Sequence, residues 1–126
     1  MLDGAALDEA LEVVADFTDL KSPLMAGHSR QVAALTAAAC ERAGLPPAEV
    51  RRARRAGLVH DLGRTAIPNS IWDKPGPLTR AERDRVQLHP ALTEKMLRRA
   101  GALDVLNPVA ACHHEKPDGS GYFNLP

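Results

Sequence analysis

The sequence predicts an all-α fold of about six short helices. Hydrophobic residues make up 44% of the 126 residues but aromatic residues only 3%, and alanine and leucine dominate the apolar set. This composition favours closely packed helices over a sheet. The length allows one domain with a modest core. We therefore predict a single domain over residues 1–126, with an N-terminal helical segment at 1–22 and a core at 23–126.

The first two helices are predicted from apolar spacing and from the residues that end helices. The opening helix has apolar residues at positions i, i+4 and i+7, namely Leu7, Leu11 and Val14. It should end before Pro23, which suits the first turn of a new helix. The second helix runs to about Arg42, with Gly44 as its C-terminal stop.

Proline and glycine also mark the third helix and the connection after it. The third helix starts at Pro46-Pro47, runs to Leu62 and is closed by Gly63. The prolines and the glycine of the next segment favour a long connection to Leu78, with one short helical turn around Ser70–Trp72.

Three further helices are predicted in the C-terminal half. Thr79–Glu82 has the pattern of a capping box and begins the fourth helix. Pro90 begins the fifth, which Gly101 ends. The sixth contains Val105–His113, and the proline and glycine residues after Glu115 cannot continue it.

Charge and cysteine content exclude several classes of protein. Sixteen basic residues balance sixteen acidic ones, so no net charge favours duplex nucleic acid or an anionic membrane. No apolar run approaches the roughly 20 residues of a membrane span, and the N-terminus lacks the features of a signal peptide. We expect a cytoplasmic protein, in which Cys40 and Cys112 are reduced thiols and small core residues.

One basic cluster stands out, consisting of Arg51, Arg52, Arg54 and Arg55. Residues 51, 52 and 55 share a helical sector away from Val50 and Ala53, which predicts a solvated face. The alternative is attraction of an anionic dinucleotide or an acidic partner, which salt would weaken.

The histidines carry the strongest functional signal. They are His28, His60, His89, His113 and His114, and each lies on a predicted helix or at a helix end. His28 shares a face with Val32 and Leu35, so we expect it to point inward. His89 precedes a proline, so we expect it outside α-helical conformation, at a helix junction. Inward imidazoles cannot all stay unpaired in a small core, and metal ions would satisfy them together.

Asp61 adds a carboxylate beside His60, and an Asp carboxylate can bridge two metal ions. A single histidine is more often a hydrogen-bonded, partly buried residue than a metal ligand. The combination of one inward His, then His-Asp, then His-Pro, then His-His before a glycine-rich loop favours the metal site.

These residues resemble the successive motifs of the HD-GYP family, a branch of the HD phosphohydrolase superfamily. The matching segments are His60-Asp61-Leu62-Gly63, Ile67-Pro68, Lys74-Pro75-Gly76, Leu78-Thr79, His89-Pro90, His113-His114-Glu115 and Asp118-Gly119-Ser120-Gly121-Tyr122. The resemblance runs from about Gly27 to the end of the chain. It implies an all-α HD-domain helical bundle and hydrolysis of the bacterial messenger cyclic di-GMP to pGpG or GMP.

The resemblance also implies a ligand set and a cofactor. The metal ligands would be His28, His60, Asp61, His89, His113 and His114, with Asp61 as the bridging carboxylate. The cofactor would be two divalent transition metals, iron or manganese first and zinc next, because imidazole and carboxylate ligands suit all three. Such a pair of ions activates water and stabilises charge on the attacked phosphate. Asp61 and Arg64 are the catalytic candidates, and Arg64, Gly119, Gly121 and Tyr122 the substrate-binding ones.

Several positions depart from the family pattern. Arg64 stands where the family usually has lysine; it can grip a phosphate but does not readily donate a proton. Phe123 replaces the proline of the Gly-Tyr-Pro signature. Leu24 occupies the position of a glutamate associated with a third metal, so two metals are favoured. Glu115 could orient a ligand histidine or be an exposed helix-end carboxylate.

Family members continue beyond the loop into helices with a further Asp ligand and basic substrate contacts. Because this sequence ends at Pro126, we expect a fragment that a homodimeric partner or a complementing C-terminal segment could complete.

Three functional hypotheses follow from the sequence. The first is a metal-dependent cyclic di-GMP phosphodiesterase, with a cyclic dinucleotide as its ligand. The second is a catalytically weak receptor or protein-interaction module, and the third is a general HD nucleotide phosphohydrolase.

Overall fold

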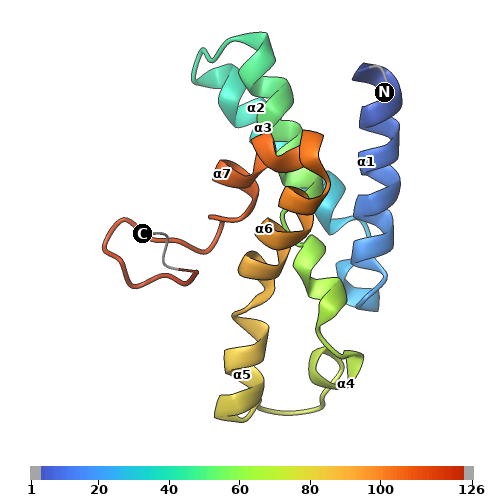
Figure 1. Cartoon of the computed structure of the whole chain (residues 1–126), viewed down its shortest axis with the longest axis vertical. Coiled ribbons are helices and arrows are strands. Elements are labelled where there is room, and N and C mark those ends of the chain that lie inside the picture. Colours follow the sequence, from blue (N-terminus) through green and yellow to red (C-terminus); the bar gives the residue numbers. More distant parts are fainter. Residues whose placement is uncertain (1–3, 124–126) are drawn as a thin grey trace.

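The computed structural model describes residues 4–123, and the regular secondary structure among them is entirely helical (Figure 1). The all-α prediction is confirmed over this range, whereas residues 1–3 of the predicted N-terminal segment and residues 124–126 lie outside it. The α-helices are α1 (Gly4–Asp19), α2 (His28–Arg42), α3 (Pro47–Val59), α4 (Asn69–Trp72), α5 (Arg80–Val86), α6 (His89–Arg99) and α7 (Asn107–Ala110). The 3-10 helices are η1 (Pro23–Met25), η2 (Leu62–Ala66) and η3 (Gly101–Leu106). None of these helices is long and apolar enough to cross a membrane.

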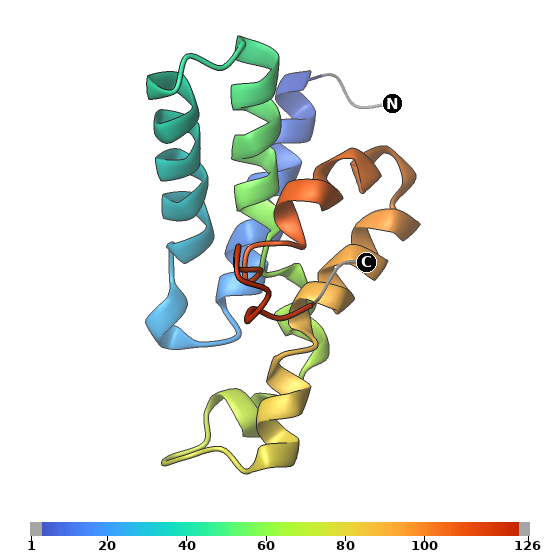
Figure 2. The same cartoon turned by 90° about the vertical axis from the view of Figure 1, so that its left-hand side faces the viewer.

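Helices α2 and α3 form an antiparallel pair, and α1 runs beside α3 (Figure 2). Small residues let α2 and α3 approach closely, since a Cβ atom on Gly57 would lie 2.8 Å from the Cα atom of Ala33. The core is completed by Leu11, Leu58 and Leu97, each at most 2% exposed. Fully burying a leucine side chain contributes about 1.5–3 kcal/mol to stability. This core fixes the helix ends at which the candidate site lies.

Ion pairs join α1 to α2 and α3 and account for much of the basic cluster. Arg54 pairs with Glu12 at 2.5 Å, and Arg55 pairs with Asp8 at 2.6 Å. The Arg55 side chain is only 18% exposed, so its predicted place on a solvated face is wrong, because its guanidinium reaches α1 and bonds to Asp8 and the Gly4 carbonyl oxygen. Arg51 is exposed as predicted. The Arg52 side chain is 41% exposed and pairs with Glu49. Because Arg52, Arg54 and Arg55 each pair with a carboxylate, most of the positive charge that could attract an anionic dinucleotide to this cluster is neutralised.

The helix boundaries differ from the sequence prediction in three places. Helix α3 ends at Val59, not Leu62, because the chain turns at His60-Asp61 into η2. The predicted sixth helix is η3 followed by the four-residue α7, so His113 lies in a turn. His89 is the first residue of α6, and the expectation that it is not helical is wrong. Pro90 is tolerated because the first turn of a helix leaves its N–H groups without intrahelical partners.

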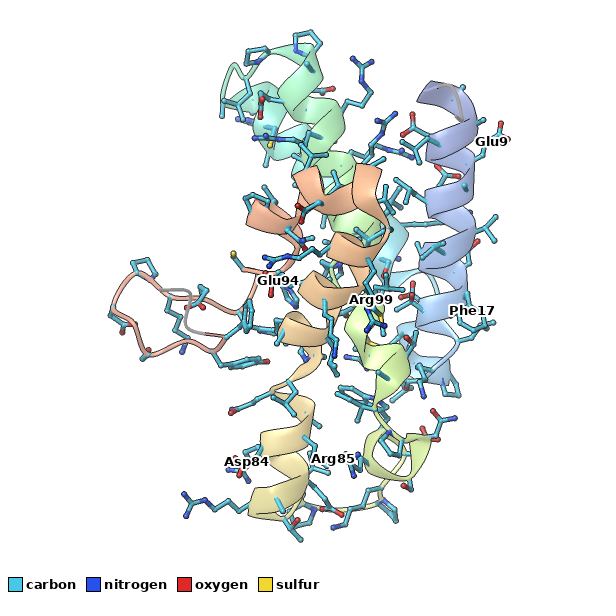
Figure 3. All side chains as sticks on the ribbon, in the orientation of Figure 1. Glu9, Phe17, Asp84, Arg85, Glu94 and Arg99 are labelled. Carbon is cyan, nitrogen blue, oxygen red and sulfur yellow. The ribbon has the colours of Figure 1, made fainter. Side chains whose placement is uncertain are left out.

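The burial of Leu35 and of the two cysteines also differs from the sequence prediction. Leu35 was expected to face inward with His28 but is 71% exposed, because α2 buries the face that carries Ser29 and Ala33. Cys40 and Cys112 are free thiols as expected, but both are half-buried and not fully in the core. Phe17 of α1 is 67% exposed and projects away from the other helices (Figure 3). The predicted short turn at α4 and the capping box of Thr79 and Glu82 are confirmed.

Gly63 joins the site to the core by a close backbone contact. Its N–H donates to the Thr93 hydroxyl at 2.8 Å, and that hydroxyl donates to the His60 carbonyl oxygen at 3.1 Å. A Cβ atom at position 63 would overlap the His89 carbonyl oxygen and lie 2.6 Å from the Thr93 nitrogen. Gly63 was predicted to close the third helix, but that helix ends earlier, at Val59. Gly63 is instead the residue that lets η2 touch α6.

We predict that Gly63→Ala destabilises the protein by about 3 kcal/mol, because neither backbone can move aside without disturbing the other. Urea unfolding followed by circular dichroism measures this change. Gly4→Ala is the matched control, since its added Cβ would meet only the Arg55 side chain at 3.7 Å. Unfolding of Gly63→Ala at the wild-type urea concentration would contradict the close-contact account.

Candidate metal centre

The six predicted metal ligands come together from four separate helix ends. His28 is the first residue of α2, and His89 is the first residue of α6. His60 and Asp61 form the turn after α3, while His113 and His114 lie in the turn after α7. Two groups of ligand atoms, each within 4.8 Å of one another, can be drawn: His28, His60 and Asp61 form one, and His89, His113 and His114 form the other. Two adjacent three-ligand groups suit two metal ions.

Asp61 lies between the two groups and faces both. Its Oδ2 atom is 3.6 Å from the Nε2 atom of His28 and 3.3 Å from that of His60. Its Oδ1 atom is 3.4 Å from the Nε2 atom of His89 and 3.5 Å from that of His113. One carboxylate oxygen thus faces each pair of imidazoles, which is the arrangement a bridging ligand requires.

Three of the histidines are oriented by the helix ends that carry them. The Nδ1 atom of His60 is 2.7 Å from the Gly57 carbonyl oxygen, that of His89 is 2.7 Å from Val86, and that of His113 is 2.8 Å from Ala110. Each carbonyl lies three residues earlier in the chain. A carbonyl oxygen can only accept, so Nδ1 carries the proton, and the lone pair of the neutral ring is on Nε2. All three Nε2 atoms consequently face the centre as potential ligands.

One contact between imidazoles itself points to a cation. The Nε2 atoms of His89 and His113 are 3.2 Å apart, although both rings use Nδ1 for the backbone. Two lone pairs repel at this distance unless a proton or a cation lies between them. Nitrogen ligands about 2.0–2.1 Å from one metal ion are separated by about 2.8–3.0 Å at octahedral angles and about 3.3–3.4 Å at tetrahedral angles. The donor set therefore fits a transition-metal ion.

Burial and charge favour an ionised Asp61. Burial opposes ionisation, but His113, His60 and His89 donate hydrogen bonds to Asp61 when Nε2 is protonated, and these bonds outweigh burial and hold the pKa of this carboxyl far below its usual range. For His60, burial lowers the pKa, while the hydrogen bond and charge of Asp61 outweigh burial and leave the pKa raised. A proton on Nε2 of His60 thus occupies the position that a metal ion would take, and protons and metal compete there.

His114 is held by the glycine-rich loop. Its ring stacks on Tyr122, with centroids 4.4 Å apart and planes at 22°, and its carbonyl oxygen accepts the Tyr122 N–H at 3.1 Å. Burial first, then the charges of His113 and His89, lower the pKa of His114 to about 4. The ring is therefore neutral near pH 7, the form that binds a metal. Burial and the Asp61 charge raise the pKa of Tyr122, whose hydroxyl keeps its proton.

The rest of the loop shows why glycine occurs at two of its positions. A Cβ atom on Gly121 would overlap the His114 carbonyl oxygen, so Gly121 allows the loop to cross that turn. Gly119 has a φ of +77°, which favours glycine. Phe123 has a φ of +79°, a value that proline cannot adopt, so the loop ends differently from the family signature. Glu115 is half-buried beside these residues, and its orienting role stays a prediction.

Arg64 lies at the edge of the centre. Its Nη1 atom is 3.9 Å from the Asp61 Oδ2 atom, and its guanidinium carbon lies 4.0 Å above the centroid of the Trp72 ring. The side chain is only 16% exposed. The predicted substrate-binding roles of Arg64, Gly119, Gly121 and Tyr122 stay predictions, although all four lie in or beside the segments that carry the ligands.

Three residues that sequence reasoning missed support the centre. Thr93 links Gly63 to the His60 carbonyl, and Trp72 covers Arg64. Asp19 is buried and accepts hydrogen bonds from the Ser29 N–H at 2.9 Å and the Ser29 hydroxyl at 2.7 Å. It caps α2 beside His28, because the N-cap residue Gly27 has no side chain. The only sequence signal was that Trp72 is the single tryptophan of the chain.

Comparison with known proteins gives a family match over nearly the whole chain. The model of an HD domain family matches residues 12–125. A protein named 3'3'-cGAMP-specific phosphodiesterase 3, from Vibrio cholerae, is 40% identical over 121 residues, which are 96% of this chain and 26% of that protein. A cyclic di-GMP phosphodiesterase of Pseudomonas aeruginosa is 44% identical over 98 residues, 75% of this chain and 23% of that protein. One from Thermotoga maritima is 30% identical over 116 residues, 90% of this chain and 31% of that protein. The chain thus spans roughly a quarter to a third of the length of these relatives.

We predict that the protein, purified without oxygen and supplied with Mn²⁺ or Fe²⁺, binds about two ions per chain. The reason is that the six ligands form two groups and that the two oxygens of Asp61 face histidines of both. Metal analysis after removal of free ions gives the stoichiometry. Binding of one ion or none under metal-replete conditions would refute the two-group interpretation.

We predict a pH-dependent loss of stability in the metal-free protein that His114 helps to cause. Its pKa falls from 6.5 to about 4 on folding, so its contribution is fully present above pH 6.5 and is lost as the pH falls towards 4. Urea unfolding at several pH values gives the free energy of unfolding. Between pH 6.5 and 4 this free energy should fall less steeply for His114→Gln than for wild type. Parallel declines would show that His114 is not kept neutral by the fold.

Proposed function

This chain belongs to the HD domain family, and on that premise we propose that it forms a metal-dependent phosphodiesterase centre acting on a cyclic dinucleotide. The substrates we propose are cyclic di-GMP, cleaved to pGpG or GMP, and the related 3'3'-cGAMP. The names of the relatives from Vibrio cholerae and Pseudomonas aeruginosa support this substrate class. The observation that carries the proposal is the buried Asp61 carboxylate with two imidazole Nε2 atoms facing each of its oxygens.

The ligands of each metal follow from the two groups. His28 and His60 would hold one ion and His89, His113 and His114 the other, with one oxygen of Asp61 on each. When bound, two such ions supply a water nucleophile near neutral pH and stabilise charge on the attacked phosphate. We propose iron or manganese as the metal, with zinc possible on the same ligands.

The protein's own contribution is to fix these groups before substrate arrives. The carbonyls of Gly57, Val86 and Ala110 hold three imidazoles in one tautomer, and Tyr122 holds the ring of His114. These four imidazoles then do not have to reorient during the reaction, which is the basis of electrostatic preorganisation. The Arg64 guanidinium lies beside Asp61, where it can bind a phosphate oxygen.

A second candidate function is a receptor that binds the cyclic dinucleotide and turns it over slowly. Arg64 favours this alternative, because a guanidinium binds phosphate well but stays protonated and so is a poor proton donor to a leaving group. The two functions share a site and differ in the rate of the chemical step.

We predict that Asp61→Ala lowers metal occupancy and reduces hydrolysis of cyclic di-GMP at least about 100-fold, because both ions lose a ligand. Arg52→Ala is the control, as this side chain is 41% exposed and pairs with Glu49 of its own helix, α3. The assay is single-turnover hydrolysis of cyclic di-GMP and of 3'3'-cGAMP, with metal content measured in each sample. Unchanged metal content in Asp61→Ala would remove Asp61 from the ligand set. Binding of both dinucleotides without turnover would favour the receptor.

A further inference from the structure

We propose that Trp72 is a positioning residue that holds the Arg64 guanidinium at the edge of the metal centre as a clamp for a phosphate oxygen. This inference rests on the proposed function, since it takes a phosphate group as the ligand. It concerns a residue outside the two ligand groups and outside the motifs that predicted the site.

Two contacts tie Trp72 to Arg64. The guanidinium carbon lies 4.0 Å over the centroid of the indole ring, within the range of a cation–π interaction. The indole Nε1–H donates a hydrogen bond to the Arg64 carbonyl oxygen at 3.2 Å. The ring therefore holds Arg64 at both its backbone and its charged end.

The position of the guanidinium explains what this holding achieves. Its Nη1 atom is 3.9 Å from Asp61 Oδ2, too far for a hydrogen bond, so the carboxylate does not engage its N–H groups. Stacking uses the face of the guanidinium, whereas its N–H groups lie at the edge, in the plane of the group. Those N–H groups form the planar fork that binds phosphate oxygens in pairs.

The same ring also lies against the metal centre. The Trp72 and His89 rings have centroids 6.3 Å apart and planes at 72°. Next to Trp72 in α4, Ile71 is buried and anchors this short helix. Trp72 thus sets the position of Arg64 relative to one ligand group, and the long Arg64 side chain would otherwise sample many rotamers.

The test is the binding of inorganic phosphate to the Mn²⁺-loaded chain, measured by calorimetry. We expect Trp72→Leu and Arg64→Met each to weaken phosphate binding about 10-fold, with metal content unchanged. Trp72→Leu in the Arg64→Met background should have little further effect, because the ring acts through the guanidinium. Trp72→Phe keeps an aromatic face and should lose less than Trp72→Leu. Phe17→Leu, which alters an exposed aromatic residue on α1, is the control and should bind as wild type does.

The single tryptophan supplies a direct readout of the stacking itself. In the metal-free protein, Arg64→Met should shift the fluorescence emission of Trp72, while Arg52→Ala should not. Thermal melts identify any variant that fails to fold, and Trp72→Phe then replaces Trp72→Leu in the comparison.

Three results would overturn the inference. They are no phosphate binding by wild type, wild-type phosphate affinity in Trp72→Leu, or a loss of phosphate affinity from Trp72→Leu that is equally large in the wild-type and Arg64→Met backgrounds. Failure of the proposed function looks different. In that case the wild-type chain would not hydrolyse cyclic dinucleotides, while the coupling between Trp72 and Arg64 in phosphate binding would persist.

Discussion

The organisation of this protein depends on one buried carboxylate. Asp61 is 5% exposed, and its two oxygens face the imidazoles of four histidines drawn from α2, α6 and the turns after α3 and α7. Burying a charge is costly unless it is paired. The charge of Asp61 is paired only if four segments of the chain converge on it. The fold and the site therefore require the same arrangement of these segments. A metal ion on each oxygen would supply the opposite charge that burial of the carboxylate requires.

Helix ends are the means by which the fold meets this constraint. The last carbonyl groups of a helix have no intrahelical partner. His60, His89 and His113 each use such a carbonyl, three residues earlier, to fix a ring. The contact between Gly63 and α6 then sets the distance between the two ligand groups. Stability of the bundle and geometry of the site are consequently linked at residues that never touch a ligand.

The sequence was sufficient for the fold class and for the grouping of the histidines, because apolar spacing and helix punctuation are local signals. The capping box at Thr79 is one such signal, and the structure contains it. The end of α3 and the exposure of Leu35 could not be predicted, since they depend on which neighbour each face meets. The roles of Asp19, Thr93 and Trp72 also require tertiary contacts, because each acts on a residue distant in sequence or on a backbone atom.

The central claim is that two metal ions share Asp61. The most direct measurement is X-ray absorption spectroscopy of the iron- or manganese-loaded protein, prepared without oxygen. A shared carboxylate predicts metal–metal scattering at about 3.5–4 Å, with imidazole nitrogen in the first coordination sphere. Ions with imidazole ligands but no metal neighbour within this range would contradict a bridging Asp61.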